Sequence, residues 1–150
     1  ISGLVATIVF DLFHQSLNYA YSIDKPKWNL LGIYFLDYKE GKFVRNSLAD
    51  DRRVTNELLW GYIIHYLIGI IYGLIYVFLN NIFFDYPSIF LSYLFGFTTV
   101  LGAWCYLMPF AYNLGFFASK SNERFNILAQ NLIAHFIFGT GLFIGYYISF

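Results

Sequence analysis

The chain has 150 residues, of which 59% are hydrophobic, 23% aromatic and 12% charged, and its formal net charge is zero. Soluble domains carry about twice this charged fraction, and a nucleic-acid-binding protein has a basic patch that this composition does not supply. These properties argue against a soluble enzyme and against a DNA-binding module. Twelve of the eighteen charges lie between Asp24 and Arg53, and the long, weakly charged remainder is typical of membrane-spanning segments.

The first apolar stretch, residues 1–23, is predicted to cross the membrane although several polar side chains dilute it. These are Asp11, His14, Gln15 and Asn18. A secretory signal peptide is a poor alternative, because there is no basic n-region and Asp11 would interrupt the apolar region. The chain begins with Ile1 and not with Met, so we expect either a processed protein or a fragment.

A polar loop, residues 24–56, follows this stretch and carries most of the charge. Its apolar segment from Trp28 to Leu36 is too short to cross a bilayer. We expect this segment to lie at the membrane interface as a short amphipathic or β-hairpin-like element. A polar turn around Gly41 is expected to follow it.

Three further apolar stretches complete the predicted membrane domain. Residues 57–79 and 126–150 are each long enough to span a hydrocarbon core of ~30 Å as one helix. The charge-free run of residues 86–119 is too long for a single span, so Pro109 is predicted to kink or end a helix over residues 88–110. The fold class that follows is all-α: an integral membrane four-helix bundle forming one transmembrane domain.

The basic residues predict an orientation. All nine Lys and Arg residues lie in the connections that follow the first and third predicted spans. Alternating topology places both connections on the same side of the membrane, and the positive-inside rule makes that side the cytoplasm. We therefore expect residues 24–56 to be cytoplasmic and both termini to lie outside.

A faint internal repeat relates the two halves of the chain. His65 precedes Gly69 as His135 precedes Gly139, with three bulky apolar residues inside each pair. The segments GLVAT and GFTTV of the first and third spans are also similar. These patterns suggest two copies of a two-helix unit, related by a pseudo-twofold axis along the membrane normal.

Four ionisable side chains within the predicted spans form the candidate site: Asp11, His14, His65 and His135. At ~1.5 Å per residue, each lies ~14–18 Å from the cytoplasmic end of its span. All four are therefore predicted near the middle of the membrane. Ionisable groups at this depth are costly and usually face the interior of a helix bundle.

Glycines at helical spacing share faces with these histidines. They are Gly61, Gly69 and Gly73 on the second span and Gly139 on the fourth. Small residues spaced in this way let helix backbones approach closely, so we expect these glycines at helix contacts. An alternative is a structural or accessory subunit whose glycine faces bind another membrane protein or a further copy of the chain.

Three interpretations of the Asp/His group stay open. In the first, these side chains only hold helices together through hydrogen bonds worth ~1 kcal/mol or less each. In the second, they form an intramembrane site for protons or a small polar ligand. In the third, they bind haem or a transition metal, with His65, His135 and Asp11 as candidate ligands.

Sequence motifs of common enzymes are absent. The chain has no P-loop, no H-E-x-x-H and no G-x-S-x-G, which are the patterns of nucleotide hydrolysis, zinc proteolysis and acyl transfer. No catalytic residue is assigned, and enzymatic activity stays open. The expected environment is a lipid bilayer, with no nucleic-acid partner.

Several segments in order resemble one known family. The series GLVATIVFDLF, SLNYA, GKF, WGYIIHYLIGI, GFTTVLGAW and HFIFGTGLF is similar to the bacterial family catalogued as domain of unknown function 2938. The resemblance implies a small multi-pass protein of the inner membrane with no assigned activity. The chain departs from the family pattern at Met108-Pro109, where the family has Gln-Pro, at Ala103-Trp104, where it has Pro-Trp, and at residues 48–55, which lack the family's prolines.

Overall fold

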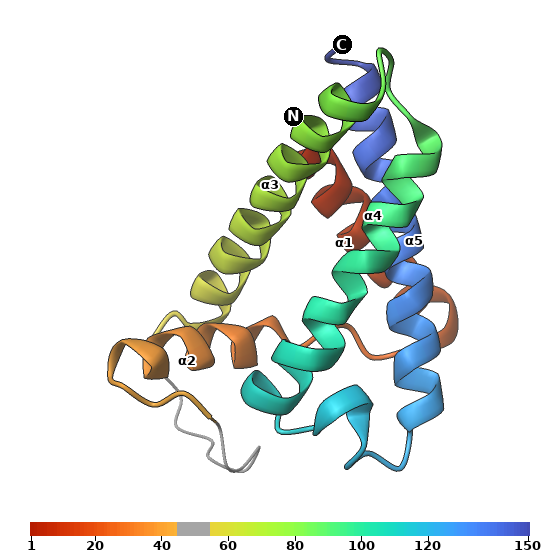
Figure 1. The fold of residues 1–150 in the computed structure, drawn as a ribbon. Helices are drawn as coiled ribbons and strands as arrows, with labels where there is room; N and C mark the ends of the chain where they lie inside the picture. The colour runs from red at the N-terminus through yellow and green to blue at the C-terminus, as the bar shows by residue number, and fades with distance from the viewer. Residues whose placement is uncertain (45–54) are drawn as a thin grey trace. The chain divides into compact units, whose positions relative to one another are not determined.

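The computed structural model describes residues 1–44 and 55–150, and in these residues the chain is helical throughout its ordered elements (Figure 1). The main helices are α1 (Ser2–Tyr21), α2 (Trp28–Lys39), α3 (Glu57–Phe83), α4 (Ile89–Gly102) and α5 (Arg124–Tyr147). Helix α4 continues directly into a π-helix, Ala103–Ala111, and a short 3₁₀ helix, Phe116–Ala118, precedes α5. The predicted all-α class is confirmed.

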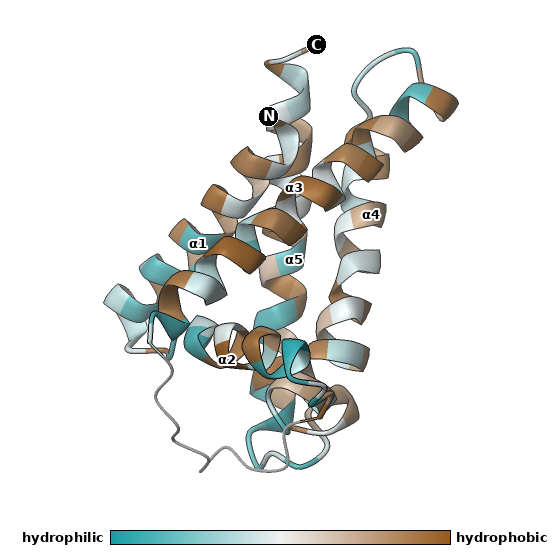
Figure 2. Ribbon diagram, turned by 90° about the vertical axis from the view of Figure 1, so that its left-hand side faces the viewer, coloured by the Kyte–Doolittle hydropathy of each residue, from teal (hydrophilic) through white to brown (hydrophobic). Residues whose placement is uncertain are grey.

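Three of these helices are long and apolar enough to cross a membrane. They are α3, the continuous helix Ile89–Ala111 and α5, and they correspond to the predicted spans 57–79, 88–110 and 126–150. Helix α1 is not among the three, and Figure 2 shows hydrophilic residues along it where α3 is mostly hydrophobic. A crossing by α1, and with it the four-helix bundle, stays a prediction.

The outer face of α3 carries large apolar side chains that are exposed. Leu67, Leu74 and Phe78 follow one another at helical spacing and are 52%, 67% and 65% exposed. A large apolar stripe of this kind marks a surface that meets another apolar phase. Lipid tails would cover it, so the exposed side chains and the hydropathy of the helix indicate the same environment.

Three local predictions can be compared directly with the structure. The segment that begins at Trp28 is the helix α2, so its hairpin-like alternative is wrong. Gly41, at φ +79°, forms the turn expected after this segment. Pro109, predicted to kink or end its helix, lies inside the π-helix, which ends two residues later at Ala111. Proline has no backbone N–H and its ring crowds the preceding turn, so it is compatible with a widened helix that ends soon after it.

The chain divides into two compact units. Unit 1 consists of residues 1–26, 66–100 and 131–150, and unit 2 of residues 27–65 and 101–130. The divisions fall inside α3 and α5 and near the end of α4, so each of these helices contributes to both units. The units are described separately below.

In unit 1, glycines set the contact between α1 and α3. A Cβ atom added at Gly3 would overlap the carbonyl oxygen of Gly69, and one added at Gly73 would overlap the backbone of Gly3. A Cβ at Gly69 would meet the hydroxyl of Thr7, which donates to the Gly3 carbonyl at 2.8 Å. The two helices therefore touch backbone to backbone, as small residues at fourfold spacing allow.

Helix α5 packs on α1 and α4 in the same way. A Cβ at Gly141 would lie 2.5 Å from the Cα of Ala6, and the hydroxyl of Ser2 donates to the Leu142 carbonyl at 2.8 Å. On the α4 side, a Cβ at Gly139 would lie 2.8 Å from the carbonyl oxygen of Ser92. Helix α1 thus contacts α3 and α5, and α5 also contacts α4.

In unit 2, the start of α3 packs closely on α2. A Cβ at Gly32 would overlap the Glu57 carbonyl, and one at Gly61 would overlap the Trp28 carbonyl. The amide of Asn29 also donates to the Glu57 carboxylate at 3.4 Å. These contacts fix the N-terminal half of α2 against the first turns of α3.

A pair of tyrosines joins α2 to the π-helix within unit 2. The hydroxyl groups of Tyr34 and Tyr106 lie 3.1 Å apart, and Tyr34 is 6% exposed. Burial and the hydrogen bond with Tyr106 raise the pKa of Tyr34. Because burial disfavours the charged phenolate, this contact is a neutral hydrogen bond at physiological pH.

Candidate functional site

Two of the predicted histidines meet around one aromatic ring in unit 1. The group, called the Phe10 cluster below, consists of Phe10, His14, Thr99, His135 and Phe138. The ring centre of Phe10 lies 4.7 Å from that of His14 and 5.7 Å from that of His135. Phe138 lies 6.4 Å from Phe10 and 6.3 Å from His135, and Thr99 Oγ1 lies 3.0 Å from His135 Nδ1.

The sequence of α1 turns Phe10 and His14 to the same buried side. Gly3, Thr7, Phe10 and His14 are all buried and recur every three or four residues, which is the spacing of one helix face. The glycine contacts at the N-terminal end of this face hold α1 close to its neighbours. Phe10 and His14 therefore extend the same packed stripe by one further turn.

Close contact between α4 and α5 brings Thr99 to His135. A Cβ at Gly96 would lie 2.6 Å from the carbonyl oxygen of His135 and 3.1 Å from the Cα of Gly139. Thr99 follows Gly96 by one turn, so its short side chain can reach the imidazole across this narrow gap. The predicted His-x-x-x-Gly pattern of α5 thus faces a Gly-x-x-Thr pattern of α4.

Most of the Phe10 cluster is buried, and His135 is half-buried. His14 is 5% exposed and Phe10 8%, and His14 also contacts the ring of Phe13 at 5.5 Å. Interactions of a charge are stronger where water is excluded, and an aromatic face stabilises a nearby cation by ~0.5–2 kcal/mol. The aromatic rings can therefore stabilise a protonated imidazole in a place where an isolated charge would be costly.

The other two predicted site residues are described separately, because one of them belongs to unit 2. Asp11 is half-buried and follows Phe10 on α1. His65 belongs to unit 2, where its ring stacks on Trp28 with centres 3.9 Å apart and planes at 21°. Asn18, another polar residue of the first predicted span, donates to the Ile23 carbonyl at 2.9 Å at the end of α1.

In residues 1–44 and 55–150, no three His, Cys, Asp or Glu side chains are grouped so that they could hold a metal ion. A transition metal usually needs three or four such donors at short distances. The candidate ligands Asp11, His65 and His135 are consequently not drawn together into a metal site among the described residues.

The four glycines predicted at helix contacts all lie against backbone or side chains of this chain. Gly61 contacts α2 in unit 2, and Gly69, Gly73 and Gly139 contact α1 or α4 in unit 1. These close approaches occupy the small-residue faces. They also position the histidine of the Phe10 cluster that comes from α5.

Four important side chains were not expected from the sequence. Phe10, Thr99 and Phe138 complete the Phe10 cluster, and the one signal for Thr99 was its place a turn after Gly96. The fourth is Asn80, 0% exposed, whose amide donates to the Tyr86 carbonyl at 2.9 Å and accepts from the Ser88 N–H at 2.8 Å. A polar residue directly after the predicted span of residues 57–79, at the start of a connection, was its only signal.

Asn80 organises the connection between α3 and α4. The adjacent Asn81 accepts a short hydrogen bond from the Tyr146 hydroxyl of α5, and Tyr76 donates to the Ser88 carbonyl at 3.2 Å. These bonds satisfy backbone groups that would otherwise be left without partners between two helices. The connection is thereby tied to both α3 and α5.

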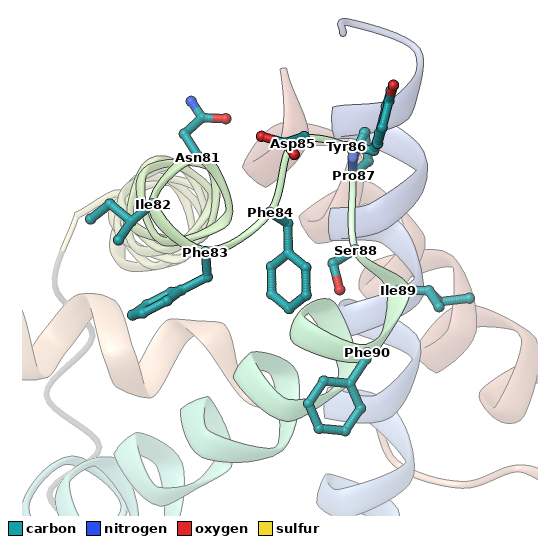
Figure 3. A pocket seen from close by; sticks show the side chains of 10 residues that line it. All are labelled: Asn81, Ile82, Phe83, Phe84, Asp85, Tyr86, Pro87, Ser88, Ile89 and Phe90. Carbon is teal, nitrogen blue, oxygen red and sulfur yellow. The ribbon is translucent and has the colours of Figure 1, made fainter.

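A shallow pocket of about 560 Å³ lies on this connection and is lined by residues 81–90 (Figure 3). Asn81 and Tyr86 point the opposite way from Phe84 and Phe90 in this view. Asp85 is the only ionisable carboxylate in its lining. The pocket contains none of the predicted site residues, and its few dispersed polar groups do not converge on a ligand position.

Comparison with known proteins places the chain in a family but adds no activity. No curated protein and no solved structure matches the chain. The family model described as "Protein of unknown function (DUF2938)" matches residues 1–149. The match agrees with the resemblance seen in the sequence and covers both units. The chain is therefore a member of the DUF2938 family.

Proposed function

We propose that this protein is a multi-pass membrane protein that takes up and releases protons at the Phe10 cluster. The observation that carries the proposal is the position of two imidazoles against one buried phenylalanine ring: His14 belongs to the same helix as Phe10, and His135 belongs to α5. Histidine changes charge near neutral pH, and ionisable groups inside membrane domains commonly mark proton pathways.

The surroundings favour a proton over the other candidate ligands. A metal would need more grouped donors than the described residues provide. A small polar ligand would need a cavity, and the pocket described above, lined by residues 81–90, contains no residue of the Phe10 cluster. A proton needs only a lone pair on an imidazole nitrogen and a group, here the Phe10 ring, that stabilises the resulting cation.

We further propose that α1 crosses the membrane beside α3 and α5. Its Ser2, Thr7 and His14 side chains are 3%, 0% and 5% exposed. Polar residues that face neighbouring helices lower the mean hydropathy of α1 without placing polar groups in lipid. This arrangement supports the four-span bundle predicted from the sequence and brings His14 into the membrane.

Proton flux into liposomes tests the function. Purified protein is reconstituted with a pH-sensitive dye inside the vesicles, and a potassium diffusion potential drives the flux. We expect the wild type to acidify or alkalinise the lumen according to the sign of the potential. His135→Gln should lower the rate by about tenfold or more, since a positioned proton-transfer group commonly contributes at least that much.

Thr98→Val is the matched control, because it removes a hydroxyl next to Thr99 that donates only within its own helix, to the Leu94 carbonyl at 2.7 Å, and it leaves every side chain of the Phe10 cluster in place. Its flux should equal that of the wild type, and circular dichroism should show the same helix content in all three proteins. A well-folded wild type without flux above that of empty liposomes would overturn the proposal. That result would favour the alternative of an accessory subunit that binds another membrane protein. Its partner surface would have to lie outside the four predicted glycines, because these already contact other helices of this chain.

We propose the inner membrane as the location, with residues 24–56 in the cytoplasm and both termini outside. The grounds are the positions of the nine basic residues and the positive-inside rule.

Cysteine labelling tests this orientation. The chain has one cysteine, so Cys105→Ala provides a background for single-cysteine labelling. In intact spheroplasts an impermeant maleimide should label Tyr86→Cys and should not label Lys42→Cys. Both positions are exposed, so both should react after permeabilisation, and the reverse pattern in intact cells would contradict the orientation.

A further inference from the structure

We infer that Thr99 is a positioning residue that holds neutral His135 with its proton on Nδ1, so that Nε2 is the atom that accepts and releases the transferred proton. The inference rests on the proposed function for its consequence. Its structural part, the tautomer of His135, can be tested without any transport measurement.

The argument begins with the single proton of the Thr99 hydroxyl. Thr99 Oγ1 lies 2.7 Å from the carbonyl oxygen of Gly96 and 3.0 Å from His135 Nδ1. A carbonyl oxygen can only accept, so the hydroxyl proton must lie between Oγ1 and Gly96. Oγ1 can then only accept from His135, and Nδ1 must carry a hydrogen.

The opposite arrangement is disfavoured by the same distances. If the hydroxyl donated to His135 Nδ1, its oxygen would face the Gly96 carbonyl oxygen at 2.7 Å with no proton between them. Thr99 is 6% exposed, so water is not available to relieve this contact. The opposite arrangement would also lose the hydrogen bond from Thr99 to the Gly96 carbonyl, and a hydrogen bond of this kind contributes ~0.5–1.5 kcal/mol.

Backbone packing keeps these distances short. Gly96 lies so close to α5 that an added Cβ would be 2.6 Å from the His135 carbonyl oxygen. Thr99 is one turn along the same face of α4, and its β-branched side chain has few rotamers in a helix. The hydroxyl is consequently fixed between the Gly96 carbonyl and the imidazole.

The tautomer determines the proton-transfer step. Neutral His135 carries its hydrogen on Nδ1 and its lone pair on Nε2. A proton that binds to Nε2 gives an imidazolium with one hydrogen on each nitrogen, and loss of the proton from Nε2 restores the starting state. The Nδ1 hydrogen stays with Thr99 throughout, so Thr99 orients the ring and takes no part in the transfer.

Nitrogen NMR of the protein in lipid bilayers tests the inference. Protein labelled with ¹⁵N-histidine is studied at a pH where the imidazoles are neutral, and the His135 signals are identified by their loss in His135→Gln. We expect a protonated Nδ1 and an unprotonated Nε2 in the wild type, although free neutral imidazole side chains favour the opposite tautomer. Thr99→Val keeps the branched shape without the acceptor and should shift His135 toward a hydrogen on Nε2.

Two variants serve as controls. Thr99→Ser keeps the hydroxyl and should keep the wild-type tautomer. Thr98→Val removes the neighbouring hydroxyl, which donates to the Leu94 carbonyl of its own helix at 2.7 Å, and should leave His135 unchanged.

A hydrogen on Nε2 of neutral His135 in the wild type would overturn the inference, and so would an unchanged tautomer in a folded Thr99→Val variant. If Thr99→Val does not fold, the wild-type spectrum alone decides. Proton flux is a separate readout: wild-type protein with the expected tautomer and no flux would contradict the proposed function and leave the role of Thr99 in place.

Discussion

Gly73→Val is expected to separate α1 from α3 and to lower the free energy of unfolding by ~2–4 kcal/mol, the upper range for overpacked sites. The added Cβ would overlap the backbone N and Cα of Gly3. Backbone atoms cannot move aside as a flexible side chain can, so α1 must shift along its whole buried face. That shift would also displace Phe10 and His14, which lie farther along the same helix.

The measurement is unfolding of the protein in mixed micelles by increasing SDS, followed by circular dichroism. Leu74→Val is the matched control, since it introduces the same side chain at the next residue, which is 67% exposed. Gly73→Ala should fall between the two, because it adds the Cβ without the two γ-carbons. Equal unfolding midpoints for Gly73→Val and Leu74→Val would show that α1 and α3 do not touch at Gly73.

The long helices could be predicted because each depends on properties of its own residues. Hydropathy and length located α3, the Ile89–Ala111 helix and α5 to within a few residues. Asn80 shows the limit of this reasoning. The predicted span ends at residue 79, so Asn80 was placed in the connection that follows it. The structure continues α3 to Phe83 and buries the Asn80 side chain, since its amide satisfies the backbone at Tyr86 and Ser88.

The candidate site was less predictable, because it depends on which helices meet. His65 and His135 occur in the same His-x-x-x-Gly pattern, and the pattern predicts a small-residue face for each. It contains no information about the partner of that face. His65 stacks on Trp28, a residue of α2, whereas His135 lies against Thr99 and Phe10, so equal local patterns have unequal surroundings.

The second large effect is predicted in unit 2, where Trp28, the stacking partner of His65, also lies against Gly61. Gly61→Val is expected to detach the N-terminal half of α2 from α3, because the new side chain would overlap the Trp28 carbonyl. A loss of ~1–3 kcal/mol from this contact should raise the amide exchange rates of residues 28–39 by about tenfold or more, at ~1.4 kcal/mol for each factor of ten. Hydrogen–deuterium exchange with mass spectrometry measures this change directly.

Leu59→Val is the control for Gly61→Val, since Leu59 lies on the same turns of α3 and is 57% exposed. Gly32→Val approaches the same interface from the other helix, where its Cβ would overlap the Glu57 carbonyl, and should accelerate exchange in the same peptides. Slow exchange of residues 28–39 in folded Gly61→Val would mean that α2 is held by contacts other than the Gly32 and Gly61 approaches. A rise confined to residues 28–39 would instead show that α2 can open locally while α3 keeps its structure.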